Sequence, residues 1–227
     1  MNGTQRKAAK VVGFCYLFAM AAGVFGESYV RGRLIVPHSA VETARNIMAN
    51  EGLFRLGLAS ELLSFISDIT MITALFVILE GTNRSFALLA TFFRLVASAV
   101  CVVMTLTSFD ALRVLSGADY LNAFSSDQLA VLGRLAIGAH GAAFNVAFIF
   151  LGLGSTVFAW LWLKSGYIPK ALAWLGIVGS FLLAAGCFAI VVAPRLQDVL
   201  GLTFMMPLGI FEVTMGFWLL IKNYREV

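Results

Sequence analysis

Long apolar runs are the feature that most constrains this chain. Six runs are long enough to cross a hydrocarbon layer of ~30 Å, which takes about 20 helical residues each. Only 12% of the 227 residues are charged, whereas soluble domains average about 25%. The sequence therefore predicts an all-α fold, a polytopic membrane bundle of six transmembrane helices that forms a single integral membrane domain over residues 1–227. The predicted spans are about 8–27, 52–79, 84–112, 128–163, 169–193 and 200–221.

The lysines predict how these spans are oriented. Under a six-span count all of them fall on one side of the membrane, and a five- or seven-span count would scatter them. Because positive residues concentrate in cytoplasmic segments, both termini are expected in the cytoplasm. The long loops 28–51 and 114–127 then face outward. The five lysines are Lys7, Lys10, Lys164, Lys170 and Lys222.

Two segments at the outer side have helical signals. Apolar residues at 41, 44, 47 and 48 have helical spacing and predict a short amphipathic helix on the outer surface. Ser125 and Gln128 have the spacing of a capping box that opens the fourth span. A helix from there to Leu163 would be ~58 Å long. We therefore expect it to begin outside the hydrocarbon or to bend near the glycines of 138–141.

A permanently charged arginine, Arg94, lies deep in the third span, where a charge is costly. At 1.5 Å per residue it is about 15 Å from Arg84, and Asp68 is about 18 Å from Glu80. The short join between these spans makes them antiparallel neighbours. The sequence thus predicts an Asp68–Arg94 ion pair, which either fixes helix register or serves a functional site.

Four residues are candidate catalytic groups: Glu61, Glu212, His140 and Asp68. Ionisable residues inside a membrane are functional-site candidates by default. Glu61 and Glu212 could each keep a proton in an apolar site and act as general acids. Asp68, held by Arg94, would stay ionised, and His140 could carry a proton in either direction.

Other polar residues in the spans are candidates for substrate binding. They grade from mid-membrane towards the outer surface, which predicts a pocket that is closed on the cytoplasmic side. Arg55, Asp110 and Arg134 have a simpler explanation, because side chains at a membrane boundary extend to the interface. The candidate substrate-binding residues are Arg94, Asn145, Arg134, Ser64, Asp110 and Arg55.

The sequence predicts no metal and no cofactor. His38 and His140 are far apart, and the three cysteines lie in separate apolar runs without metal-ligand spacing. HExxH, GxSxG and Walker-type motifs do not occur. No basic, aromatic-interleaved patch suggests a nucleic-acid partner.

Five stretches resemble a bacterial family of integral membrane proteins of unknown function (DUF4386). The resemblance implies a six-helix protein of the bacterial cytoplasmic (inner) membrane, without an assigned activity. A looser similarity, in arrangement only, is to small membrane terpene cyclases, which protonate an isoprenoid with two membrane-embedded carboxylates, as Glu61 and Glu212 would. The five stretches are NEGLFRLG at 50–57, FFRLV at 92–96, LSGADYLNAF at 115–124, RGRLIVP at 31–37 and SGYIP at 165–169.

Three functions are compatible with these observations. The first is an enzyme of the lyase, isomerase or cyclase type, with an acid–base site for proton-driven cyclisation, isomerisation or hydrolysis of an isoprenoid- or lipid-like molecule. The second is a carrier or channel for a small polar solute or for protons, including a proton-coupled carrier. The third is an accessory subunit whose outer loops, with Arg31 and Arg33, meet a partner. Expected partners are membrane lipids, a lipophilic small molecule and a second copy of the chain.

Overall fold

The described part of the protein is helical, and no strand occurs in it. The computed structural model describes residues 1–222, apart from the side chain of Tyr120. Six helices in this range are long and apolar enough to cross a membrane, which confirms the predicted all-α bundle. The elements are α1 (Gly3–Gly23), η1 (Val24–Arg31), α2 (Gly32–Leu34), α3 (Ala40–Ala49), α4 (Glu51–Leu79), α5 (Arg84–Leu115), η2 (Asp119–Leu121), α6 (Ser126–Ser165), α7 (Lys170–Val192), α8 (Leu196–Leu200), η3 (Thr203–Met205) and α9 (Met206–Ile221).

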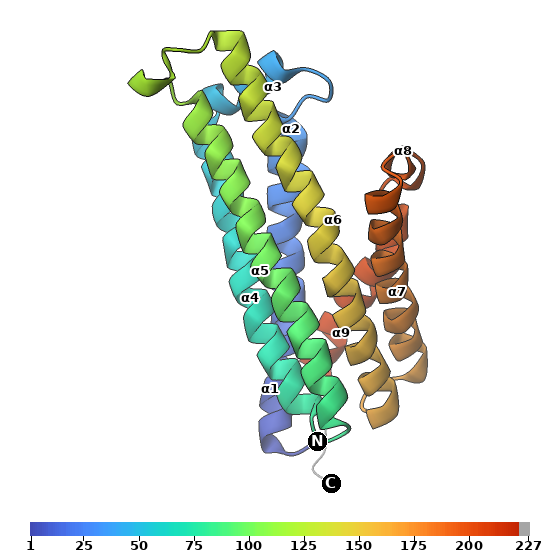
Figure 1. Ribbon diagram of the computed structural model, residues 1–227. Helices are drawn as coiled ribbons and strands as arrows, with labels where there is room; N and C mark the ends of the chain where they lie inside the picture. The colour runs from blue at the N-terminus through green and yellow to red at the C-terminus, as the bar shows by residue number, and fades with distance from the viewer. Residues whose placement is uncertain (223–227) are drawn as a thin grey trace.

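The six long helices of the described residues are neighbours in a closed ring. Helix α1 packs along α4, α4 along α5, α5 along α6, α6 along α7 and α7 along α9, which returns to α1. The N-terminus and the C-terminal end of α9 lie at one end of the ring, the terminal end, and α3 lies at the opposite end, the α3 end (Figure 1). Helices α5 and α6 extend past α7 and α9 at the α3 end (Figure 1).

The first span is longer than predicted. It continues from α1 through the π-helix η1 and through α2, so the helical segment runs from Gly3 to Leu34. The prediction of a loop from residue 28 was therefore wrong, and Arg31 lies in the helix rather than in an outer loop. The physical reason is that Arg31 is buried and bonded inside the bundle, so its charge does not mark the end of the span.

The short helix α3 is confirmed, but it is packed rather than free. Ser39 caps it by accepting a hydrogen bond from the Glu42 amide at 3.3 Å, as expected at a helix N-terminus. Its contacts are chiefly with α6. Ile47 is fully buried in a core cluster with Phe54 and Leu112, so α3 packs onto the bundle at this end.

Helix α6 is a single unbroken helix of 40 residues. The predicted capping box is present: Ser125 Oγ accepts from the Gln128 amide at 3.3 Å, and Gln128 Oε1 accepts from the Ser125 amide at 2.9 Å. The helix runs through Gly138 and Gly141 without interruption. Of the two explanations for its length, extension past the neighbouring helices is the one seen at the α3 end (Figure 1).

Close packing of α6 against α7 depends on Gly152. A Cβ added there would lie 2.6 Å from the Ser180 carbonyl oxygen and 2.7 Å from the Ala184 amide nitrogen. Both neighbours are backbone atoms, which cannot move aside without separating the helices. We expect Gly152→Ala to lower the free energy of unfolding by about 1–3 kcal/mol, as overpacking does. Thermal unfolding in detergent measures this.

Gly138→Ala is the matched control on the same helix. Nothing lies within 4 Å of a Cβ at Gly138, so only helix propensity changes, in favour of alanine by about 1 kcal/mol or less. If Gly152→Ala were as stable as Gly138→Ala, the packing of α6 against α7 would not be as described.

Candidate functional site

The predicted Asp68–Arg94 ion pair is present between α4 and α5. The Arg94 side chain is only 2% exposed and that of Asp68 is 14% exposed. Ser98 donates to Asp68 Oδ2 at 2.5 Å, and Arg94 Nη1 donates to Ser155 Oγ at 2.6 Å. These four residues form the mid-bundle cluster, in which each charge has a counter-charge and a hydroxyl partner.

Glu212 lies near the mid-bundle cluster. It is half-buried on α9, and the charges that act on it are those of Arg94 and Asp68. Tyr16 of α1 packs edge-on against the neighbouring Phe211, with ring centroids 6.2 Å apart. The charges that act on Glu212 thus group it with Asp68 and Arg94 rather than with Glu61, and its assignment as a catalytic group stays a prediction.

A second polar cluster lies at the α3 end, where η1, α4, α5 and α6 meet. We call it the α3-end cluster, and its centre is His140. The imidazole is 2% exposed, and its Nε2 lies 2.5 Å from Glu27 Oε1. Its Nδ1 lies 3.2 Å from Ser108 Oγ. The cluster consists of Glu27, Arg31, Glu61, Ser108 and His140.

Arg31 connects two members of this cluster. Its Nε lies 3.3 Å from Glu27 Oε2, and its Nη1 donates to Ser108 Oγ at 3.3 Å. Both ring nitrogens of His140 are therefore held by groups that Arg31 also holds. Arg134 lies near enough to act electrostatically on Arg31.

Glu61 differs from every other charged residue of the two clusters. Its side chain is buried, at 3% exposure, and among the described residues neither carboxyl oxygen has a hydrogen-bond partner. Buried polar groups are nearly always bonded, and an unpaired one costs about 1–3 kcal/mol. The charges that act on Glu61 are those of Glu27 and Arg31.

The local backbone explains how these groups come together. The π-helix η1 carries both Glu27 and Arg31, and π-helical segments inside α-helices are frequent at functional sites. Gly26 lets α4 approach closely, because a Cβ there would lie 3.0 Å from Glu61 Cγ and 3.2 Å from the Gly57 carbonyl oxygen. The close approach places Glu61 beside Glu27.

The α3-end cluster also offers a set of metal-ligand atoms. One ligand atom from each of Glu27, Glu61 and His140 lies within 4.8 Å of the other two. Two carboxylates and an imidazole are ligands that first-row divalent metals accept.

The remaining predicted site residues belong to neither cluster. Ser64 donates to the Ala19 carbonyl oxygen at 3.3 Å, which joins α4 to α1. Asn145 donates to the Gly141 carbonyl oxygen of its own helix at 3.2 Å. Arg55 pairs with Glu51 and Asp110 pairs with Arg113, in both cases on the same helix and exposed. Their assignment to substrate binding stays a prediction.

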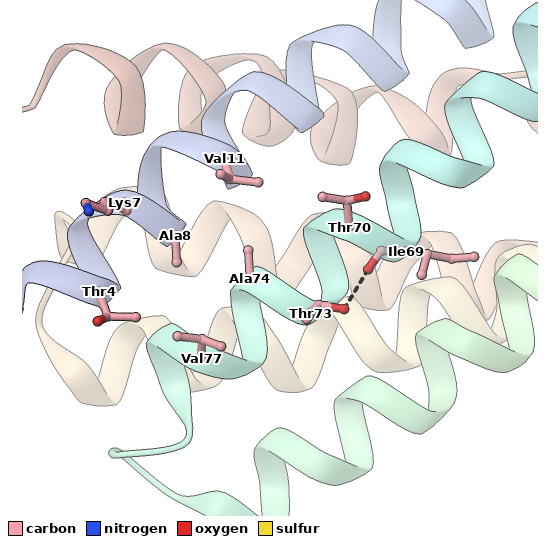
Figure 2. Close-up of a pocket in the computed structure, with 9 residues that line it drawn as sticks. All are labelled: Thr4, Lys7, Ala8, Val11, Ile69, Thr70, Thr73, Ala74 and Val77. Atoms are coloured by element: carbon pink, nitrogen blue, oxygen red, sulfur yellow. Dashed lines mark hydrogen bonds between the residues drawn. The ribbon is translucent and has the colours of Figure 1, made fainter.

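An open groove lies elsewhere on the bundle, between α1 and α4 near the terminal end. Figure 2 shows Thr4, Lys7 and Val11 of α1 facing Thr70 and Thr73 of α4 across it. Its volume is about 530 Å³. A second groove of about 480 Å³ continues along the same two helices and shares Val11 and Thr70. None of the predicted site residues lines either groove.

Sequence reasoning missed three members of the α3-end cluster. Glu27 and Arg31 are four residues apart and of opposite charge, which is a pairing signal on a helix. The predicted first span instead ends at Glu27 and leaves Arg31 in the loop that follows. Ser108 gave no signal, since a serine in a membrane helix is common.

These observations define a class: a six-helix membrane protein with two buried polar clusters. Residues 11–223 match a family described as a domain of unknown function (DUF4386). The chain belongs to this family, which confirms the resemblance found in the sequence. No curated protein and no solved structure matches it.

Proposed function

We propose that this protein is a membrane-embedded enzyme that acts on a lipophilic substrate, with the α3-end cluster as its reaction centre. The observation that carries the proposal is the buried Glu61 carboxyl, which has no partner among the described residues. A group that costs free energy when left unpaired is expected to gain its partner from outside the chain. Glu27 and His140 stand beside it and would contact the same bound group.

The surroundings of Glu27 support a lipophilic substrate. Glu27 is 35% exposed, so the cluster is reachable from the surface of the bundle. Phe25 and Tyr29 of η1 are exposed and stacked with their ring centroids 5.7 Å apart, so the same segment presents an apolar face to the membrane. Because Glu27 lies in a membrane-spanning segment, an apolar molecule in the membrane would reach it at the surface where its side chain is exposed.

The chemistry available is proton transfer and polarisation. Carboxyl and imidazole groups are the usual side chains for general acid–base catalysis, and the Arg31 guanidinium can stabilise negative charge. This set suits hydrolysis, isomerisation or cyclisation of an isoprenoid- or lipid-like molecule. The lysines at the terminal end favour cytoplasmic termini in a bacterial inner membrane, which would put the reaction centre in the outer half.

A carrier is the second candidate, and the arrangement along α4 favours it. Glu61 and Asp68 are seven residues apart on that helix, and each belongs to a separate polar cluster. Two polar clusters at successive depths are what a path for a proton or small solute requires. In a non-catalytic accessory subunit both clusters would serve stability only.

Native mass spectrometry with lipid analysis of the gently purified protein tests the proposal. We expect the wild type to retain a specific lipophilic molecule, and Glu61→Gln to lower its occupancy at least tenfold or to change its chemical form. Glu51→Gln is the matched control, since it makes the same chemical change on an exposed part of α4. Bulk membrane lipid alone in all three proteins would contradict the proposal.

A further inference from the structure

We propose that Glu27, Glu61 and His140 bind a divalent cation of the Zn²⁺ class. The inference rests on the proposed function and supplies the missing partner of its reaction centre. The three residues come from η1, α4 and α6, and their ligand atoms already lie within 4.8 Å of one another.

Glu27 and His140 present two ligand atoms to one point. Glu27 Oε1 and His140 Nε2 are 2.5 Å apart, joined by the hydrogen bond that holds this place without a cation. Zinc–ligand bonds of ~2.1 Å at a tetrahedral angle put two ligand atoms roughly 3.4 Å apart. The two atoms must therefore separate by about 1 Å, which the partly exposed Glu27 side chain can accommodate.

Glu61 supplies the third ligand and the independent observation. It is buried, it lies beside Glu27 and His140, and neither of its oxygens is bonded among the described residues. A carboxylate so placed has unused lone pairs and no competing donor. A cation at the common point of the three residues would satisfy it.

Ser108 and Arg31 orient the ligands as outer-shell partners do. A metal-bound imidazole needs a free lone pair on the ligating nitrogen, so its proton must be on the other one. His140 Nδ1 faces Ser108 Oγ at 3.2 Å, and this hydroxyl oxygen can accept a hydrogen bond from the Nδ1–H group. Arg31 Nε holds Glu27 Oε2 at 3.3 Å and so turns Oε1 towards His140.

Charge balance also favours a cation. Glu27 and Glu61 carry two negative charges when ionised, and Arg31 is the cation paired with Glu27. One carboxylate is left without compensation in a buried place, which is costly. Three protein ligands leave a fourth position for water or a substrate oxygen, as in catalytic zinc sites. Within the proposed reaction classes, this favours hydrolysis.

Metal binding is tested on the full chain, purified in detergent through an affinity tag that contains no histidine. We expect the wild type to hold or take up about one equivalent of Zn²⁺ by elemental analysis, and Co²⁺ to give visible absorption bands of a low-coordinate site. Glu61→Gln and His140→Asn should abolish both, whereas Glu51→Gln should bind as the wild type does. Ser108→Ala should weaken Zn²⁺ binding about 10–100-fold, as loss of an outer-shell partner does.

The test separates this inference from the proposed function. No uptake of Zn²⁺ or Co²⁺ by the wild type, or equal uptake by wild type and Glu61→Gln, would overturn the metal site. A Glu61-dependent lipophilic molecule could still be found in that case, and the function would stand without a metal. Stoichiometric Zn²⁺ together with bulk lipid only would uphold the metal site and contradict the function. A variant that fails to fold leaves the wild-type measurement decisive.

Discussion

Arg94→Met should lower the free energy of unfolding by about 3–5 kcal/mol, the usual cost of breaking a buried ion pair. The substitution leaves the Asp68 carboxylate in the mid-bundle cluster with only Ser98 as a described hydrogen-bond donor. Methionine fills much of the volume of the arginine stem, so lost charge compensation dominates over lost packing. Unfolding in detergent, followed by tryptophan fluorescence, measures the change.

The double variant Asp68→Asn/Arg94→Met should recover much of this loss. With no charge left in the cluster, the desolvation cost falls, and asparagine can still accept a hydrogen bond from Ser98. Coupling between residues in contact is measured by such a cycle. The control is Arg55→Met on the same bundle, where the pair with Glu51 is 55% and 41% exposed and is worth at most ~1 kcal/mol. Equal effects of Arg94→Met and Arg55→Met would show that the buried pair does not stabilise the fold.

The Asp68–Arg94 pair could be predicted from the sequence because local geometry determines it. The turn between α4 and α5 is short, so the two helices are antiparallel neighbours, and counting residues from the turn gives the depth of each group. Neither the short turn nor the count of residues from it depends on how the other helices pack. The capping box at Ser125 and the helix at 40–49 were predictable for the same reason, since their signals lie within a few residues.

The α3-end cluster could not be predicted, because it depends on three helices and an irregular turn. The π-helical turn at Val24–Arg31 has no sequence signature, and it changes which residues of the first span face inward. Arg31 and Ser28 also lower the local hydropathy, so the sequence predicts that the span ends there. The position of Glu212 beside the mid-bundle cluster likewise depends on how α9 closes the ring, which no short-range pattern determines.

Glu61→Met should raise the free energy of unfolding by about 1–3 kcal/mol, which is the penalty of an unbonded buried polar group. Methionine is unbranched and similar in length, so it fits the space beside Gly26 and removes both orphan oxygens. Methionine is thus expected to stabilise the folded protein when it replaces Glu61 and to destabilise it when it replaces Arg94. The measurement is the same unfolding experiment, without added metal.

The expected changes in the free energy of unfolding have opposite signs at Glu61 and Arg94. This difference distinguishes a charged residue that binds a ligand from one that stabilises the fold. Stability gained at the cost of a bound ligand is the expected pattern at a functional site, because binding groups are held in unfavourable states until the ligand arrives. Glu61→Met should therefore lose Zn²⁺ uptake and the retained lipophilic molecule while it gains stability. Glu51→Met, on the exposed part of α4, should change stability by at most ~1 kcal/mol, which is the worth of its exposed pair with Arg55. A loss of stability in Glu61→Met would mean that Glu61 has a structural partner, and the case for the reaction centre would fail with it.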